Sequence, residues 1–496
     1  MTLRAATLFL IATSVALSAC AKLPLATVPA SERDAIAGRL MRDIETLSSD
    51  EFDGRKPGTD AEALTVDYIT REMQAAGLVS GTNDPGSAWR APVELVSSTP
   101  QQGTITLKDG RRIVTPAAEA GAVMTSGRRM LLEGGDMVFV GSEDESIVAE
   151  DIAGKVAVML GERGVSPARR AILFESRPAA VLTVVNGPDE IEAVNRAFGR
   201  ERVVLASEET NQLSAFVTHD VMSRLVGEDR WLALVGAAED PNFVPIQLGA
   251  TASFDAKSTH REFTSSNVIG MLPGTVRDSG AVLLLAHWDH LGECAPETPD
   301  PICNGAVDNA SGVAVLLELG RRLAAEAPYD RDIYLMATTA EESGLLGAKA
   351  FAEAPPMPLD SIVAAFNFDT VAIAPAGTAL GFVGEGRSAL DSLVIETATE
   401  AGRQLGNKDF AESFVRRQDG WALLEKGVPA VFLSSAFASE IVLGPYLAED
   451  YHRPTDQLGY IELGGAIDDL LLHQELVRRT ASTASYTPPA AASLAQ

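Results

Sequence analysis

Apolar runs and helical segments alternate through the second half of the chain, and this alternation limits the folds that it can adopt. Short continuous apolar runs predict buried strands, and they lie at Val282–Ala286, Ile333–Met336, Ile362–Phe366 and Ala430–Leu433. Helical periodicity fills the segments between and after them, near 311–326, 344–353, 389–403 and 464–480. Such alternation predicts an α/β fold in which a mostly parallel, mixed sheet is flanked by helices.

The chain is long enough for more than one domain, since its 496 residues suggest two or three. In residues 93–255, short apolar runs recur between turns, which indicates a β-rich insert. We expect the surrounding α/β domain to comprise residues 31–92 and 256–480. The Ser, Thr, Pro and Ala residues at 481–496 predict a disordered tail.

The N-terminus has the layout of an export signal. A single charge at Arg4 precedes an apolar stretch at 5–17, which is short for a membrane span. The sequence Leu-Ser-Ala-Cys that ends at Cys20 resembles a bacterial lipobox. The alternative is an ordinary signal peptide with an incidental cysteine.

The lipobox resemblance implies cleavage of a signal peptide at 1–19, lipidation of Cys20 and a tether at 20–30. We therefore expect a periplasmic protein that is lipid-anchored to the bacterial envelope, or else a secreted one. Ala21 favours the outer membrane as the destination. The protein would meet the membrane only through its N-terminal lipid.

Charge and cysteine content exclude several classes of protein. The chain has 40 Lys and Arg against 68 Asp and Glu, a net charge of −28, which argues against a nucleic-acid partner. Three cysteines are too few for a disulfide scaffold or a four-thiolate zinc site. With Cys20 assigned to lipid, we expect Cys294 and Cys303 to form a disulfide in an oxidising periplasm.

Histidines and carboxylates follow the predicted strands. Ligands bind an open α/β sheet at the carboxyl ends of its strands, so these side chains are expected to meet at one edge. A lone carboxylate at such a place is commonly a helix cap or a strand end, but the joint order of the whole set makes accident a poor explanation. The set is His287, Asp289, Asp308, Glu341, Glu342, Asp369 and His452.

Imidazoles and carboxylates without thiolates suit zinc or a harder divalent ion. Two imidazoles and three carboxylates are too many ligands for one tetrahedral zinc, but they fit two metals that share a bridging carboxylate. One more carboxylate must stay unliganded to take a proton from the metal-activated water. The doublet Glu341–Glu342 offers one ligand and one base.

These motifs resemble the co-catalytic, two-zinc metallopeptidases, a family that contains bacterial leucyl aminopeptidases and glutamate carboxypeptidases. The resemblance covers about 40–92 and 255–480, and it implies a zinc-peptidase fold of the phosphorylase/hydrolase-like type. The insert between these parts resembles a protease-associated (PA) domain. The motifs are Ser49–Arg55, His287-x-Asp289, Gly305-Ala306-x-Asp308-Asn309-x-Ser311-Gly312, Glu341-Glu342, Asn367-x-Asp369 and Tyr451-His452-x-Pro454-x-Asp456.

The resemblance implies two zinc ions per chain and a role for each predicted residue. Glu341 would be the general base, and Asp289 would orient an imidazole ligand. Tyr451 and Asp456 would support His452. For His290, a structural hydrogen bond is favoured over a place in the pocket. The metal ligands would be His287 with Asp369, Glu342 with His452, and Asp308 as the bridge.

The substrate is less constrained than the metals. Many relatives carry Ser-Asp-His where this chain has Gln418-Asp419-Gly420, so hydrolysis is expected while the preference is open. We expect a peptide substrate and an aminopeptidase, because an acidic site suits a free α-amino group. A carboxypeptidase would need an arginine for the substrate carboxylate, and Arg416, Arg417 and Arg453 are candidates. An amidase on this scaffold and a non-catalytic receptor-like homologue are further alternatives.

Overall fold

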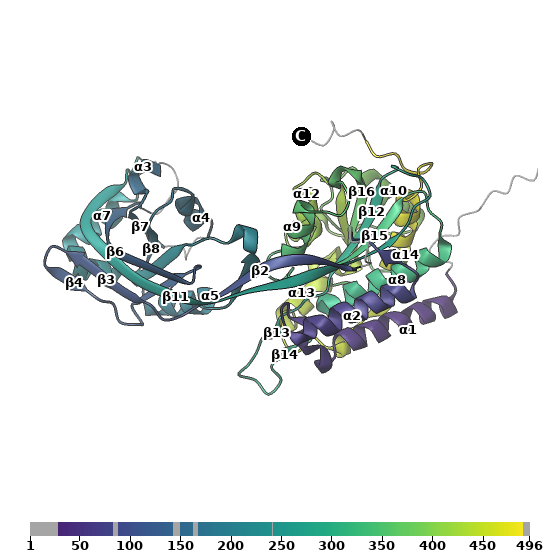
Figure 1. Ribbon diagram of the computed structural model, residues 1–496, viewed down its shortest axis with the longest axis horizontal. Helices are drawn as coiled ribbons and strands as arrows, with labels where there is room; N and C mark the ends of the chain where they lie inside the picture. The colour runs from purple at the N-terminus through teal and green to yellow at the C-terminus, as the bar shows by residue number, and fades with distance from the viewer. Residues whose placement is uncertain (1–27, 83–87, 142–148, 162–166, 241, 490–496) are drawn as a thin grey trace, which may run out of the picture.

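The chain forms two lobes that are joined by two long strands, β2 (Arg90–Pro100) and β11 (Ile246–Leu272) (Figure 1). The predicted signal peptide and Cys20 lie outside the described residues. Within the described ranges, no helix combines the length and the apolar character that crossing a membrane requires. The computed structural model describes residues 28–82, 88–141, 149–161, 167–240 and 242–489.

The larger lobe is built on a sheet with the strand order β17-β18-β16-β12-β15-β11. Its four central strands are parallel, whereas β17 (Gly381–Val383) and β11 pair antiparallel at the flanks. The predicted α/β fold with a mostly parallel, mixed sheet is thus confirmed, and each of the four apolar runs is a parallel strand. These strands are β12 (Ala281–His287), β15 (Asp332–Thr338), β16 (Ile362–Asn367) and β18 (Ala430–Ser434).

Helices bury both faces of this sheet. Along β12, Val282 and Leu284 pack into the core on one face, while Leu283 and Leu285 pack into the core on the other. Because side chains alternate along a strand, this arrangement requires the continuous apolar runs seen in the sequence. The first face is covered by α1 (Ala30–Leu47), α2 (Asp60–Ala75), α8 (Ser311–Glu326), α10 (Asp391–Glu400) and α14 (Leu463–Thr480), and the second by α9 (Leu346–Glu353) and α12 (Gly420–Leu424).

The smaller lobe, which comprises the elements from β3 to α7, is rich in strands and has its own apolar core. β11 pairs with β6 in this lobe and with β15 in the larger one. The predicted boundaries near 93 and 255 therefore fall inside the two connecting strands. The likeness to a PA domain stays a prediction. The strands are β3 (Thr104–Asp109), β4 (Arg112–Val114), β5 (Gly121–Thr125), β6 (Arg129–Phe139), β7 (Val156–Leu160), β8 (Ala180–Val185), β9 (Arg202–Leu205) and β10 (Leu213–Thr218); the helices are α3 (Ala149–Ile152), α4 (Pro167–Glu175), α5 (Pro188–Phe198), α6 (His219–Val226) and α7 (Glu228–Ala237).

Short elements and loops complete the larger lobe. They are η2 (Asp50–Arg55), β1 (Val79–Ser80), β13 (Gly292–Glu293), β14 (Ile302–Cys303), η4 (Ala306–Ala310), η5 (Leu359–Ser361), α11 (Lys408–Glu412), η6 (Ser435–Ala438), α13 (Glu440–Glu449) and η7 (Leu458–Tyr460).

The predicted disordered tail at 481–496 begins too early. Arg331 donates hydrogen bonds to the main-chain oxygens of Ser482 and Tyr486, and the Tyr486 side chain packs into the core of the larger lobe. The guanidinium donors and the apolar contact fix a segment whose composition alone suggested disorder. Residues 490–496 lie outside the described part of the chain.

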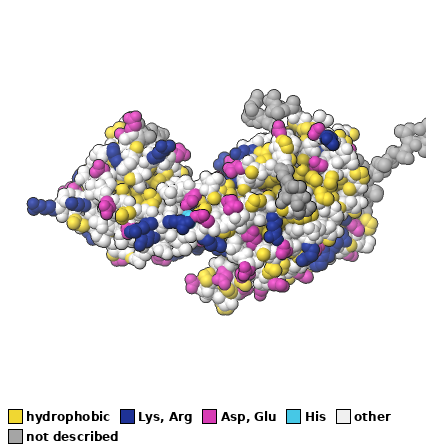
Figure 2. Space-filling model, in the orientation of Figure 1, with side chains coloured by type: hydrophobic (Ala, Val, Ile, Leu, Met, Phe, Trp, Pro, Cys, Tyr) yellow, Lys and Arg dark blue, Asp and Glu magenta, His cyan; other side chains and the backbone are white. Residues whose placement is uncertain are grey.

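Acidic and basic side chains are interspersed on the face shown in Figure 2. The net charge of −28 is therefore not gathered into a single acidic patch on that face.

The smaller lobe also contacts the loop that follows β15. Leu205 of β9 lies in one apolar cluster with Leu95 of β2 and with Ala340 and Leu346 of the larger lobe. Ala340 has φ 51°, in the left-handed region that is uncommon for residues other than glycine, and it directly precedes Glu341. The contact between the lobes thus supports the loop that carries the predicted base.

Candidate metal centre

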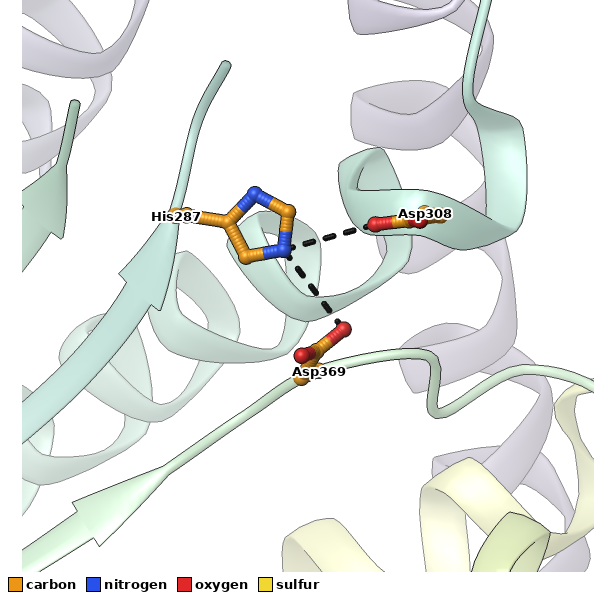
Figure 3. A group of neighbouring side chains, drawn as sticks. All are labelled: His287, Asp308 and Asp369. Carbon is orange, nitrogen blue, oxygen red and sulfur yellow. Dashed lines mark ion pairs between the residues drawn. The ribbon is translucent and has the colours of Figure 1, made fainter. Parts of the chain in front are cut away.

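The register of the parallel strands brings the predicted donors to one edge of the sheet. His287, the last residue of β12, pairs with Thr338 at the end of β15, and Leu285 pairs with Asn367 at the end of β16. Asp369 follows β16 within two residues. Figure 3 shows His287 at its strand end, facing both Asp308 and Asp369.

One group of donors surrounds the His287 imidazole. Its Nε2 atom lies 3.3 Å from Oδ1 of Asp308 and 3.5 Å from Oδ1 of Asp369. All three side chains are buried, and their ligand atoms are close enough together to hold one ion. The pairing of His287 with Asp369 that was predicted as one half of the metal site is therefore present in the fold.

A second group lies on the other side of Asp308. Nε2 of His452 is 3.0 Å from Oε2 of Glu342 and 3.4 Å from Oδ2 of Asp308. Asp308 thus presents one oxygen to His287 and the other to His452. All five predicted ligands converge, and Asp308 takes the bridging position between two groups.

His290 belongs to the second group as well. Its Nδ1 atom lies 2.7 Å from Oε1 of Glu342, so it supplies a hydrogen bond to a predicted ligand. His290, Asp308 and Glu342 also form a set of three donors close enough to hold an ion. Glu342 therefore has an imidazole near each of its oxygens, His290 at Oε1 and His452 at Oε2.

The electrostatics of the cluster fit divalent cations. Burial raises the pKa of Glu341 well above its usual range, and the carboxylates of Asp419 and Glu342 raise it further. Burial would lower the pKa of His287, but Glu341 and the other carboxylates hold it well above its usual value. So many buried negative groups call for compensating positive charge, and imidazole and carboxylate donors without thiolates suit zinc.

Asp289 acts differently from the prediction. Its carboxylate lies 3.9 Å from Nδ1 of His287, which is too long for a hydrogen bond, and the ring nitrogen instead contacts the Asp289 main-chain oxygen at 3.1 Å. The two carboxylate oxygens accept the main-chain N–H groups of Glu341 and Glu342, at 3.1 and 3.4 Å. Asp289 therefore fixes the position of the glutamate doublet, and its main chain orients the imidazole.

Asp456 also has a different role from the expected support of His452. Its carboxylate accepts the main-chain N–H groups of Val307 and Asp308, at 2.8 and 3.0 Å. The hydroxyl of Tyr446 donates to the same carboxylate at 2.9 Å. Asp456 thus holds the main chain of the bridging residue. Support for His452 comes from Tyr451, whose ring stacks on the imidazole with 3.7 Å between the ring centroids.

Two residues without a predicted role, Asn309 and Thr370, lie beside the ligands. The Asn309 amide donates to the main-chain oxygen of Phe368 and accepts from Gly312 N–H, so it ties the Asp308 loop to the strand that leads to Asp369. The Thr370 hydroxyl donates to Oδ1 of Asp369 at 2.9 Å, the same oxygen that faces His287. Asn309 thus acts on Phe368, which is distant in the sequence, whereas Thr370 acts on the residue that precedes it.

Arg55 connects the N-terminal motif to the site. It is fully buried, and burial lowers its pKa to about 10. Its guanidinium donates to the main-chain oxygens of Leu47, Trp288, Asn304 and Gly305, at 2.6 to 2.9 Å. One side chain thereby holds the loop after His287 and the loop before Asp308.

We expect Arg55→Ala to lower the free energy of unfolding by at least about 3 kcal/mol, because four buried carbonyls lose a charged donor. Arg55→Lys should restore only part of the loss, since an ammonium lacks the planar fork. Chemical denaturation measures both changes. Arg129→Ala is the control, because Arg129 forms a two-pronged ion pair with Asp255 at the surface. Equal effects of the two alanine substitutions would contradict this role of Arg55.

A disulfide joins Cys294 to Cys303, with 5.7 Å between their Cα atoms. It closes the hairpin of β13 and β14, and Cys303 immediately precedes the loop that Arg55 binds. Gly54, at φ +60°, packs against this hairpin, where an added Cβ would lie 2.4 Å from the Cys303 main-chain oxygen. The hairpin is therefore held by the disulfide and by its packing against Gly54.

A pocket opens beside the donors. One side is formed by His287, Asp308, Glu341, Asp369 and Thr370. The rest of the wall is mainly apolar, and its apolar side chains belong to a single hydrophobic cluster. Of the Gln418-Asp419-Gly420 stretch, no residue lines the pocket, and the Gln418 amide bonds within its own loop, to Val415 and Gly420. The rest of the wall consists of Phe414, Arg417, Phe432, Phe437, Leu443, Leu447 and Tyr451.

The larger lobe has a mostly parallel sheet with imidazoles and carboxylates gathered at its strand ends. This arrangement resembles that of an α/β metallopeptidase domain. Residues 267–469, the part of the chain that carries every residue of the donor cluster, match the model of peptidase family M28.

A curated relative agrees with that match. A stretch of 91 residues is 36% identical to the aminopeptidase YwaD of Bacillus subtilis (strain 168), and it spans 18% of this chain and 18% of that protein.

Solved structures share the fold. The aminopeptidase from Aneurinibacillus sp. strain AM-1 is 19% identical, with a TM-score of 0.56 over 92% of this chain and 96% of that one. A zinc aminopeptidase from Bacillus subtilis is 18% identical, with a TM-score of 0.47 over 91% of this chain and 97% of that one. At this identity, the likeness to the Aneurinibacillus structure shows the fold. It covers 92% of this chain and so extends beyond residues 267–469.

Proposed function

We propose that this protein is an aminopeptidase that uses two zinc ions to remove N-terminal residues from peptides. The observation that carries the proposal is the position of Asp308, whose two oxygens face His287 on one side and His452 on the other, at 3.3 and 3.4 Å. A carboxylate placed between two imidazole–carboxylate groups is the arrangement that two neighbouring ions require. The family match and the named relatives support the same activity.

In this proposal, each side chain has a defined task. When bound, the zinc ions supply a pair of Lewis acids that activate water and polarise the scissile carbonyl. His287 and Asp369 would hold one ion, Glu342 and His452 the other, and Asp308 both. Glu341 lines the pocket, and its carboxylate has no hydrogen-bond partner among the described residues. It is therefore available to take a proton from the attacking water and to return it to the leaving amine.

The charge of the pocket favours amino-terminal cleavage. The carboxylates on the metal side suit a free α-ammonium group, while the apolar wall suits an uncharged N-terminal side chain. An acetylated amine carries no charge, so it would not make this interaction.

The test compares free and N-acetylated leucine p-nitroanilide as substrates. We expect acetylation to lower kcat/KM by at least about 100-fold, as a site built to bind an amine rejects a substrate that lacks it. Chelation should abolish hydrolysis, and added zinc should restore it. Equal cleavage of both substrates, or cleavage within a peptide blocked at both ends, would contradict the assignment.

A further inference from the structure

One cationic side chain lines the pocket among its apolar residues. Of the three arginines that the sequence offers as carboxylate partners, only Arg417 lines the pocket. Arg416 lies over the Trp421 ring, with its Cζ atom 5.1 Å from the ring centroid. Arg453 donates to the main-chain oxygen of Glu449. The structure therefore selects Arg417 from three arginines that the sequence left as equal candidates.

Aromatic neighbours hold the Arg417 guanidinium in place. Its Cζ atom lies 5.4 Å from the Phe414 ring centroid and 5.8 Å from that of Tyr451. Its Nη2 atom donates to the Tyr451 hydroxyl at 3.2 Å. Tyr451 in turn stacks on His452, so the arginine is linked through one ring to the metal side of the pocket.

The Arg417 side chain is exposed, and among the described residues its one hydrogen bond is to the Tyr451 hydroxyl, so its other donors are free to bind a ligand. Among the described residues, no carboxylate lies within ion-pair distance of it, although most other arginines around the larger lobe are paired. Arg403, for example, binds Asp469, and Arg321 binds Asp43. A planar guanidinium with free donors recognises a carboxylate by two parallel hydrogen bonds. The ligand that fits Arg417 is therefore a carboxylate of the substrate.

The pocket indicates where that carboxylate comes from. The wall around Arg417 is apolar, with Phe432, Phe437 and Leu443, so it suits an N-terminal side chain without charge. The carboxylate must then come from the other side of the scissile bond. In a dipeptide, the C-terminal carboxylate follows that bond within one residue, or about 3.5 Å of extended chain.

We propose that Arg417 binds the free C-terminal carboxylate of dipeptides whose N-terminal residue is apolar, and that it thereby makes the enzyme a dipeptidase. This inference rests on the proposed aminopeptidase function. Longer peptides have an amide where the dipeptide has its carboxylate, so they cannot form the ion pair with Arg417.

The test compares Phe-Leu with its C-terminal amide, Phe-Leu-NH₂. The wild-type enzyme should prefer the dipeptide at least about 10-fold in kcat/KM, the value of one hydrogen-bonded charge pair. In Arg417→Met, which keeps the length of the side chain, this ratio should fall to about one. Arg417→Lys should give an intermediate ratio. Arg416→Met is the matched control, because Arg416 is the adjacent arginine outside the pocket, and it should keep the wild-type ratio.

A binding measurement separates this inference from the catalytic proposal. Calorimetry with a reduced dipeptide, in which CH₂–NH replaces the scissile CO–NH, should show the same preference over its C-terminal amide, and Arg417→Met should remove it. If no substrate is hydrolysed, the catalytic proposal fails while this binding arm still decides the role of Arg417.

Two results would overturn the inference: a wild-type ratio near one, or a ratio that Arg417→Met leaves intact. A preference for Asp or Glu p-nitroanilide over the leucine substrate that disappears in Arg417→Met would also overturn it, because the carboxylate would then belong to the N-terminal side chain.

Discussion

Glu341→Gln should lower kcat by between about 10²- and 10⁴-fold, the usual contribution of a general base, while the zinc content stays at the wild-type value. Glutamine has nearly the same shape but cannot accept the proton of the attacking water. Metal binding should survive, because the Glu341 carboxylate lies 4.0 Å from the nearest imidazole nitrogen and the five proposed ligands remain. The measurements are kcat for leucine p-nitroanilide and zinc by mass spectrometry.

Glu353→Gln serves as the control for this prediction, since Glu353 is an exposed residue at the end of α9. It should retain full activity. If Glu341→Gln kept activity within a few-fold of the wild type, another group would have to be the base. If it lost zinc as well as activity, Glu341 would be a ligand and the assignment of the doublet would have to be reversed.

Asp308→Ala should remove both zinc ions and should lower activity further than Glu341→Gln, because its two oxygens face both donor groups. Single substitutions on either side make the sharper comparison. Asp369→Ala removes a donor from the His287 group alone, and His452→Ala removes one from the Glu342 group alone. Each should lose about one of two zinc ions, whereas Asp308→Ala should lose both.

Zinc content measured on all three folded variants tests this account of Asp308. Circular dichroism of each variant checks that the fold is kept. An Asp308→Ala protein that retained one tightly bound zinc would show that the carboxylate does not bridge, and that the two groups bind independently.

The sequence predicted the parallel core of the sheet well because each central strand is buried on both faces. A strand of this kind must be apolar throughout, so Val282–Ala286 is recognisable without any knowledge of its neighbours. The long strand β11 was not recognisable in this way. Its residues alternate between buried and exposed and pass from one lobe to the other, so its pairing with β6 and β15 depends on distant partners.

The donor cluster was predictable because catalytic side chains follow strand ends in a fixed order. The residues that position the cluster were not, because they bind main-chain atoms. Arg55 holds four carbonyls, and Asp456 holds two N–H groups beside the bridge. Main-chain groups are the same in nearly every residue, so the type of the partner residue does not reveal these bonds. Neither the role of Arg55 nor the observed role of Asp289 therefore follows from a motif.

The most direct test of the central claim is the zinc stoichiometry of the wild-type protein. Metal-free protein should bind two equivalents of Zn²⁺ in a calorimetric titration, and hydrolysis of leucine p-nitroanilide should return as those sites fill. A folded protein that binds no zinc, or one that hydrolyses the substrate equally well without metal, would contradict the account of this site.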